Sequence, residues 1–220
     1  MISKSNRNAI PAVCGLALLA AAAHAENHRG FYATADLGIA WTPDVELKEY
    51  FGPVAPGTEL KFDPGVRFGA AGGYRFCDWF SAEIQTGVMS SSIRSISGAD
   101  DVDAVFSNIP LLANVRFEFP SKYPITPYIG VGAGLSISAI SIDEIDLDGT
   151  EVEGSDATAV FACQGFAGLR YDLNDRMSLG LEYRYFRTTD PSWDGDDLPG
   201  ELRFSEVETH AVSFVFQYRF

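Results

Sequence analysis

Apolar side chains alternate with polar or small ones along most of this chain, and that period of two is the period of a β-strand. The alternation is clearest over residues 211–220. One side of that segment carries Val212, Phe214, Phe216, Tyr218 and Phe220, and the other carries Ala211, Ser213, Val215, Gln217 and Arg219. Residues 177–185 repeat the pattern, with Met177, Leu179, Leu181, Tyr183 and Tyr185 on one side.

Eight segments show this alternation. They cover residues 31–41, 66–76, 80–88, 108–119, 127–135, 158–171, 177–185 and 211–220. Each is long enough to cross a bilayer as a tilted strand, whereas no run of about 18 apolar residues follows the N-terminal segment. The pattern therefore predicts an all-β protein, an eight-stranded antiparallel up-and-down transmembrane β-barrel.

The predicted connections alternate in length. Short turns fall at 77–78, 120–124 and 173–175, and long connections at 42–62, 90–107, 139–157 and 188–205. Outer-membrane barrels have short periplasmic turns and long external loops, so both termini are expected on the periplasmic side.

The two faces of the predicted strands differ in chemistry. One face holds most of the strand charges together with many glycines; the charges are Arg67, Arg75, Arg116, Arg170, Arg184, Arg219, Asp36, Glu83, Glu118 and Glu182. A soluble sandwich or lipocalin-type barrel would turn that face toward water. However, small residues suit a narrow lumen, and aromatic residues near the strand ends of the apolar face are typical of a membrane interface. We therefore expect the charged face to point inward.

Five charged residues are predicted to lie in the middle of the lumen: Asp36, Glu83, Arg116, Glu182 and Arg184. An eight-stranded barrel has an interior only wide enough for side chains, so opposite charges there should pair and close the passage. Breaking one pair, for example by Arg184→Ala, is expected to cost about 3–5 kcal/mol because a buried carboxylate loses its partner.

The first 25 residues are predicted to be a signal peptide. Lys4 and Arg7 precede an apolar stretch at 12–23, and Ala23-His24-Ala25 has the form that signal peptidase cleaves. Cleavage after Ala25 would leave residues 26–220 as the outer-membrane barrel domain.

Charge and cysteine content narrow the function classes. The formal net charge is −14 and most of the 30 acidic residues lie in the four long connections, which argues against nucleic-acid binding. Because these external segments are acidic, they could hold divalent cations loosely. Cys77 and Cys163 follow the signal segment; whether they pair is left open by the sequence.

Candidate chemistry is sparse, and no catalytic, cofactor-binding or metal-ligating residue is predicted. His210 and Ser213 could suggest a lipid A deacylase, but residues three apart on a strand point to opposite faces. Residues 143–156 are acidic, yet Asp146 and Asp148 match only part of an EF-hand loop, whose twelfth position would be Ser155.

The order and spacing of several short motifs resemble a known family. The motifs are Phe31–Gly38, Ile109–Arg116, Pro127–Gly134, Leu179–Tyr185 and the ending Tyr218-Arg219-Phe220. Together they resemble the small eight-stranded outer-membrane β-barrels of Gram-negative bacteria, the OmpA-like and OmpX-like proteins. The peptidoglycan-binding domain that follows the barrel in full-length OmpA-type proteins is not expected, since the sequence stops at Phe220.

The resemblance implies an outer-membrane location, contact with lipid and lipopolysaccharide, and recognition of the terminal Phe220 by the barrel assembly machinery. We expect a structural or surface-interaction role, with external ligands or host surfaces as partners, and no enzymatic activity. A narrow porin-like channel for small solutes is the alternative, and a lipid A-modifying enzyme is a third hypothesis.

Overall fold

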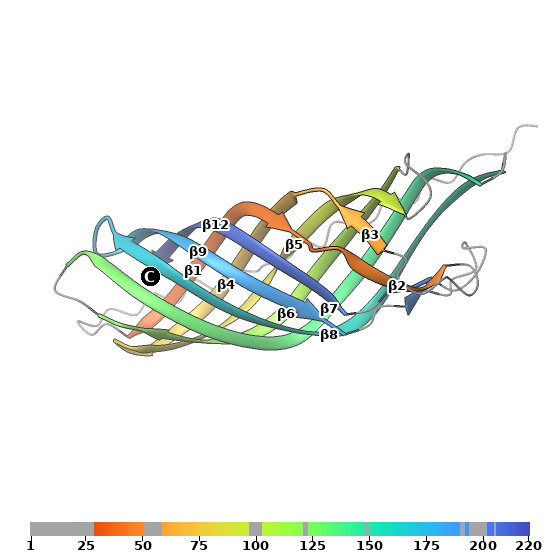
Figure 1. Ribbon diagram of the computed structural model, residues 1–220. Coiled ribbons are helices and arrows are strands. Elements are labelled where there is room, and N and C mark those ends of the chain that lie inside the picture. The colour runs from red at the N-terminus through yellow and green to blue at the C-terminus, as the bar shows by residue number, and fades with distance from the viewer. Residues whose placement is uncertain are drawn as a thin grey trace, which may run out of the picture.

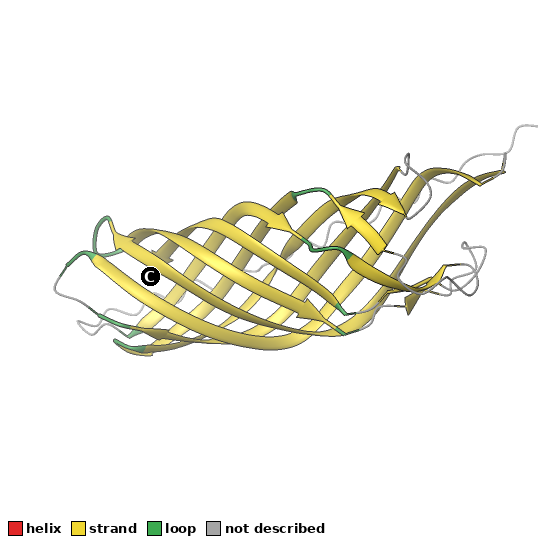
Figure 2. Ribbon diagram, viewed as in Figure 1, coloured by secondary structure: helices red, strands yellow, loops and turns green. Residues whose placement is uncertain are grey.

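The computed structural model describes residues 29–50, 59–96, 103–120, 123–147, 150–189, 192–193, 202–204 and 206–220. Strands, turns and short irregular segments make up all of these residues (Figure 2). Within the described ranges, no helix is long and apolar enough to cross a membrane.

Eight strands form a closed antiparallel barrel whose strands are strongly tilted (Figure 1). They are β1 (Gly30–Trp41), β4 (Gly65–Cys77), β5 (Phe80–Ile96), β6 (Asp103–Glu118), β7 (Ile125–Leu147), β8 (Thr150–Asp172), β9 (Met177–Thr188) and β12 (Val207–Arg219). Each pairs with the next, and β12 pairs with β1 to close the ring. The predicted eight-stranded fold is confirmed.

The long connections contain more strand than the sequence pattern predicts. Four short strands lie within two of them, namely β2 (Val45–Tyr50), β3 (Glu59–Phe62), β10 (Ser192–Trp193) and β11 (Leu202–Phe204). In addition, β7 and β8 run for 23 residues each, well past the predicted ends at 135 and 158. The prediction of loops there was wrong, because antiparallel pairing continues beyond the barrel and satisfies the backbone polar groups.

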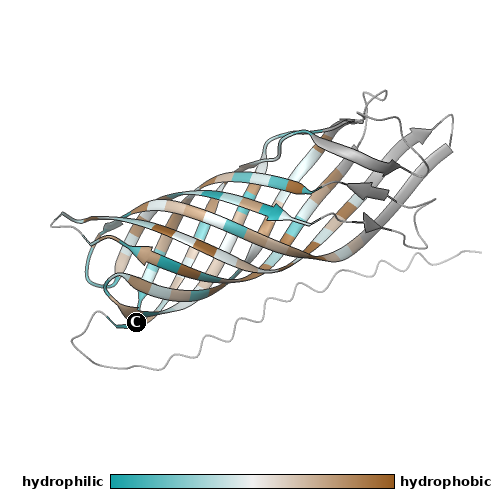
Figure 3. Cartoon of the chain, turned by 60° about the horizontal axis from the view of Figure 1, so that its bottom comes forward, coloured by the Kyte–Doolittle hydropathy of each residue, from teal (hydrophilic) through white to brown (hydrophobic). Residues whose placement is uncertain are grey.

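The strand faces separate as the alternation predicts. Apolar residues such as Leu37 and Phe214 point outward and are 63% and 76% exposed, whereas the charged face lies inside. Brown and teal positions accordingly alternate along the strands in Figure 3. Aromatic rings gather on the outside near the short-turn end, the end of the barrel that carries connections 78–79, 119–124 and 173–176; Trp79, for example, stacks on Phe117.

The inward face changes along the barrel axis, and toward the long connections it mixes apolar side chains with neutral polar ones such as Asn108, Ser136 and Ser138. The section nearer the short-turn end is polar and charged. Beyond it, toward the long connections, the inward side chains of Met89, Leu112, Ala162 and Phe186 form a buried apolar cluster. The sequence analysis predicted charges and small residues on the inward face but no cluster of apolar side chains there.

Two sequence-based predictions concern residues that the structure does not fully describe. The predicted signal peptide, residues 1–25, lies outside the described residues, as do the side chains of acidic residues 143–156. Cys77 and Cys163 are both free thiols.

Candidate functional site: the charged lumen

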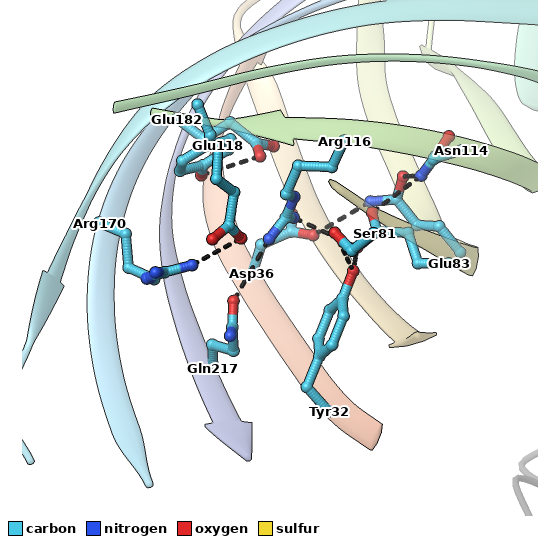
Figure 4. Close-up of polar contacts among 12 residues, drawn as sticks. Tyr32, Asp36, Ser81, Glu83, Asn114, Arg116, Glu118, Arg170, Glu182 and Gln217 are labelled. Atoms are coloured by element: carbon cyan, nitrogen blue, oxygen red, sulfur yellow. Dashed lines mark hydrogen bonds and ion pairs between the residues drawn. The ribbon is translucent and has the colours of Figure 1, made fainter. Parts of the chain in front are cut away.

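The charged section of the lumen is built from inward-facing side chains of six barrel strands, β1, β4, β5, β6, β8 and β9. Its four buried carboxylates are Asp36, Glu83, Glu118 and Glu182, and its five buried arginines are Arg67, Arg75, Arg116, Arg170 and Arg184. We call this set the lumen network; Figure 4 shows part of it. Since each strand contributes alternate residues, the network follows directly from the period of two.

Three carboxylates in the network each pair with one arginine. Arg67 Nε lies 2.8 Å from Asp36 Oδ2, and Arg116 Nη2 lies 3.3 Å from Glu83 Oε2. Arg184 pairs with Glu182, two residues before it on the same strand. These pairs confirm the prediction that Asp36, Glu83, Arg116, Glu182 and Arg184 meet inside the barrel as opposite charges.

A tyrosine, a glycine and a glutamate on three neighbouring strands form a recurring arrangement. In the first instance Tyr32 on β1 lies opposite Gly73 on β4, which lies opposite Glu83 on β5. The Tyr32 hydroxyl donates a hydrogen bond to Glu83 Oε2 at 2.8 Å. A Cβ on Gly73 would lie 2.5 Å from Tyr32 Cζ, so the absence of a side chain at Gly73 makes room for the tyrosine ring.

The second instance occurs on β7, β8 and β9. Tyr128 lies opposite Gly168, which lies opposite Glu182. The Tyr128 hydroxyl donates to Glu182 Oε2 at 3.0 Å, and a Cβ on Gly168 would again lie 2.5 Å from the tyrosine Cζ. We call the two arrangements the first and second Tyr–Gly–Glu units.

Arg116 lies between the two units. Its guanidinium pairs with Glu83 of the first unit, and its Cζ lies 4.6 Å from the ring centroid of Tyr128 in the second. It also donates through Nη1 to Gln217 Oε1 at 3.3 Å. A guanidinium over an aromatic face is attracted by the ring quadrupole, so Arg116 holds the neighbouring strand β7, and its bond to Gln217 reaches β12 on the opposite wall of the barrel.

Neutral amides extend the network toward the apolar cluster. Gln164 Nε2 lies 2.7 Å from Gln85 Oε1 and 2.6 Å from Asn114 Oδ1. Arg184 Nη1 donates to the same Gln85 oxygen at 2.7 Å. These contacts connect β5, β6, β8 and β9 across the lumen.

At the short-turn end, Glu118 is shared by two arginines. Arg170 Nη1 lies 2.6 Å from Glu118 Oε1, and Arg75 Nη2 lies 3.0 Å from Glu118 Oε2. Closer to the rim, Asp172 Oδ1 lies 3.0 Å from Arg219 Nη2 and 3.3 Å from Arg170 Nε.

Sequence reasoning missed several neutral members of the network. The alternation and the charge pattern do not single out Gln85, Gln164, Tyr32 or Tyr128. The two tyrosines could have been found from the sequence, because each lies on a strand face that is otherwise rich in glycine. Which glycine receives each ring depends on strand register, which the sequence pattern leaves open.

His210 and Ser213 lie on opposite faces of β12, as predicted. Ser213 is buried inside the barrel, whereas His210 faces outward, where its Nδ1 is 2.7 Å from the Tyr183 hydroxyl and its ring stacks on Trp41. Among the described residues, no group of three or more His, Cys, Asp or Glu side chains is placed to hold a metal ion.

Comparison with solved structures supports the same architecture. OprG from Pseudomonas aeruginosa superposes with a TM-score of 0.58 at 15% identity, over 88% of this chain and 99% of that one. AlkL gives a TM-score of 0.57 at 20% identity over 91% and 94%. Neisserial surface protein A gives 0.54 at 18% identity over 87% and 97%. At these identities the likeness establishes the fold alone.

Sequence relatives include uncharacterized proteins of Brucella abortus and Brucella suis, each 27% identical over 147 residues. The aligned region covers 56% of this chain, and the chain spans about half the length of these relatives. Residues 11–220 match the family described as outer membrane protein beta-barrel domain. The chain therefore belongs to the outer membrane protein beta-barrel domain family and is an outer-membrane β-barrel protein.

Proposed function

We propose that this protein is a closed outer-membrane barrel with a structural and surface-interaction role, rather than a channel for solutes. The observation that carries the proposal is the lumen network, in which ion pairs and aromatic contacts join neighbouring strands. Hydrogen bonds from Arg116 to Gln217 and from Arg184 to Gln85 link opposite walls of the barrel. The apolar cluster of Met89, Leu112, Ala162 and Phe186 follows it along the axis. A solute would have to separate these contacts to pass.

Single-channel recording tests the closed lumen. We expect the purified wild-type barrel to give no lasting conductance steps in planar bilayers, with a porin in the same bilayers as the positive control. Large, stable open-channel currents from the wild-type protein would overturn the proposal and favour the alternative, a narrow porin-like channel.

The surface role is assigned to the long-connection end. There β7 and β8 extend together beyond the barrel, and β2, β3, β10 and β11 add a further paired segment. We place this end outside the cell and both termini in the periplasm, where short turns are usual. The acidic long connections would then meet lipopolysaccharide, divalent cations, external ligands or host surfaces.

Replacing part of the long-connection end with a short linker tests the surface role. A variant in which residues 44–61 are replaced by a Gly-Ser linker removes β2 and β3 but leaves the eight barrel strands. We expect it to assemble normally while cells carrying it lose the binding or resistance phenotype of the wild-type strain. A phenotype equal to wild type would count against these segments as the interaction surface.

Assembly is proposed to depend on Phe220, which follows β12 and whose backbone N–H donates to the Phe31 carbonyl oxygen at 3.1 Å. We expect Phe220→Ser to lower the amount of folded, heat-modifiable protein in outer membranes, through weaker recognition by the barrel assembly machinery. Unchanged assembly at normal expression would contradict this.

We further propose that the chain is not an enzyme. The placement of His210 and Ser213 on opposite faces supports this, because a base must lie within hydrogen-bond reach of its nucleophile. Mass spectrometry of lipid A from a deletion strain provides the test. An altered acylation pattern that the wild-type gene restores would favour the lipid A-modifying hypothesis.

A further inference from the structure

The barrel divides into two four-stranded halves of similar construction. The first half is β1, β4, β5 and β6, and the second half is β7, β8, β9 and β12. Each half carries one Tyr–Gly–Glu unit on its first three strands, in the same pairing register. The fourth strands, β6 and β12, lie opposite each other across the ring. They therefore occupy equivalent positions in the two halves.

The ends of β6 and β12 carry the same side-chain pattern. Residues 115–119 are Val-Arg-Phe-Glu-Phe, and residues 216–220 are Phe-Gln-Tyr-Arg-Phe. In both segments the first, third and fifth side chains lie on the outward face, and the polar side chains between them lie on the inward face. Phe119 is 51% exposed and Phe220 is 52% exposed. We call residues 115–119 the internal segment and residues 216–220 the terminal segment.

The backbone contacts of the two segments also match. The Phe119 N–H donates to the Pro127 carbonyl oxygen at 2.9 Å, and the Phe220 N–H donates to the Phe31 carbonyl oxygen at 3.1 Å. Pro127 and Phe31 each precede the tyrosine of a Tyr–Gly–Glu unit, and the residue before each phenylalanine pairs with that tyrosine. Each half thus joins the first strand of the other half in the same register.

The position of β6 within its half distinguishes it from another strand with a similar end. Residues 74–76 of β4 are Tyr-Arg-Phe, the same as residues 218–220. However, β4 pairs with β1 and β5, which both belong to its own half. One edge of β6 pairs with β5, and the other pairs with β7 of the second half. Until β7 joins, β6 has an edge of unpaired N–H and C=O groups, as β12 has until it pairs with β1.

We propose that the internal segment on β6 is a second recognition site for the barrel assembly machinery. This inference rests on the proposed recognition of the terminal segment through Phe220. A strand of the machinery pairs with the free edge of β6 through backbone hydrogen bonds, and its surface receives the outward rings of Phe117 and Phe119. The machinery holds the completed first half in this way until β7 replaces it on the same edge.

Outer-membrane levels of full-length variants test the inference. Phe119→Ser should lower the amount of folded, heat-modifiable protein as Phe220→Ser does, and the double variant should lower it further. Phe119→Tyr should assemble normally because it keeps the ring. Phe76→Ser is the matched control and should also assemble normally, since Phe76 is 47% exposed at the same end but lies on a strand that is flanked within its half.

The outcomes separate this inference from the proposal on which it rests. Normal assembly of Phe119→Ser together with impaired assembly of Phe220→Ser would refute the internal site and leave terminal recognition in place. Normal assembly of Phe220→Ser would contradict terminal recognition itself. Equal losses in Phe119→Ser and Phe76→Ser would also overturn the inference, because any outward ring at this end would then be needed.

Refolding without the machinery separates recognition from stability. The wild-type and Phe119→Ser chains are refolded into detergent micelles and unfolded with urea. We expect equal midpoints, because substitutions of exposed side chains usually change stability little. A midpoint that falls in Phe119→Ser as far as in a variant of the lumen network, such as Arg184→Ala, would make the loss in cells a stability effect and overturn the inference.

A competing peptide tests direct binding. A synthetic peptide of residues 105–119 should slow the insertion of the wild-type chain into lipid vesicles that contain the purified assembly machinery. The control is the same peptide with Phe117→Ser and Phe119→Ser, which should leave the insertion rate unchanged. An unchanged rate with the first peptide, or equal slowing by both, would refute recognition of the internal segment.

Discussion

The two Tyr–Gly–Glu units have the same backbone register but stabilise their glutamates in different ways. Glu83 in the first unit receives hydrogen bonds from Tyr32 and Asn114 and pairs with Arg116 on the neighbouring strand. Glu182 in the second unit receives a hydrogen bond from Tyr128 and pairs with Arg184 on its own strand.

This difference sets how strongly each glutamate depends on its arginine. A carboxylate with two neutral donors keeps part of its stabilisation when its arginine is removed, whereas one with a single neutral donor keeps less. The second unit should therefore depend more on its arginine and on its tyrosine than the first. Four predictions test this comparison, from the largest effect to the smallest.

Removing the arginines should have the largest effect. Arg184→Ala leaves Glu182 with the Tyr128 hydroxyl, and we expect a loss of about 3–5 kcal/mol in unfolding free energy. Arg116→Ala should fall at the lower end of that range, since Tyr32 and Asn114 still donate to Glu83. Urea unfolding of the refolded variants in detergent measures both. A larger loss for Arg116→Ala would show that its contact with the Tyr128 ring outweighs the donor count.

Removing the tyrosine hydroxyls should have the next largest effect. Tyr128→Phe takes away the neutral donor to Glu182 and should cost about 1.5–3 kcal/mol, the usual range for hydrogen bonds to charged groups. Tyr32→Phe should cost less, because Asn114 continues to donate to Glu83. The same urea titration provides the measurement, and equal losses in the two variants would remove the basis for the comparison.

Filling the glycine positions should cost about 1–3 kcal/mol, because an added methyl group would overlap a tyrosine ring. Gly73→Ala and Gly168→Ala are the test variants, and a Cβ at each would lie within 2.7 Å or 2.8 Å of strand backbone oxygens as well. Gly72→Ala is the matched control, since a Cβ there would meet nothing within 4 Å and the change also restricts the unfolded chain. If the midpoint of urea unfolding falls equally in Gly72→Ala and Gly73→Ala, overlap with the tyrosine ring is not the cause of the lost stability.

Removing an ion pair on the outer face of the barrel should have the smallest effect on the unfolding free energy. Arg187 pairs with Glu206 and lies 3.9 Å from Glu208, with about half of each side chain exposed. Arg187→Ala should change the unfolding free energy by less than about 0.5 kcal/mol, because solvent screens exposed pairs. A loss as large as that of Arg184→Ala would mean that burial does not set the strength of these pairs.

The sequence predicts the fold more completely than the site. The alternation at Val212 to Phe220 and the charges on one face predicted the barrel, its closure and which side chains point inward. The extension of β7 and β8 could not be read from the same pattern, because strand ends depend on whether a neighbouring strand continues to pair. The apolar cluster around Phe186 was missed since an inward position in a barrel can be apolar or polar without breaking the alternation.

What the sequence by itself determined is the set of residues that share the lumen, because a period of two assigns each side chain to one face without any knowledge of its neighbours. Only the tertiary structure decided which of these inward-facing side chains contact one another. Tyr32 reaches Glu83 and Arg116 reaches Gln217, because strand register and barrel closure bring together residues far apart in the chain. A slip of one residue in strand register would turn these side chains to the lipid face. Side-chain packing and turn lengths together fix the register, and the register determines the contacts inside the lumen.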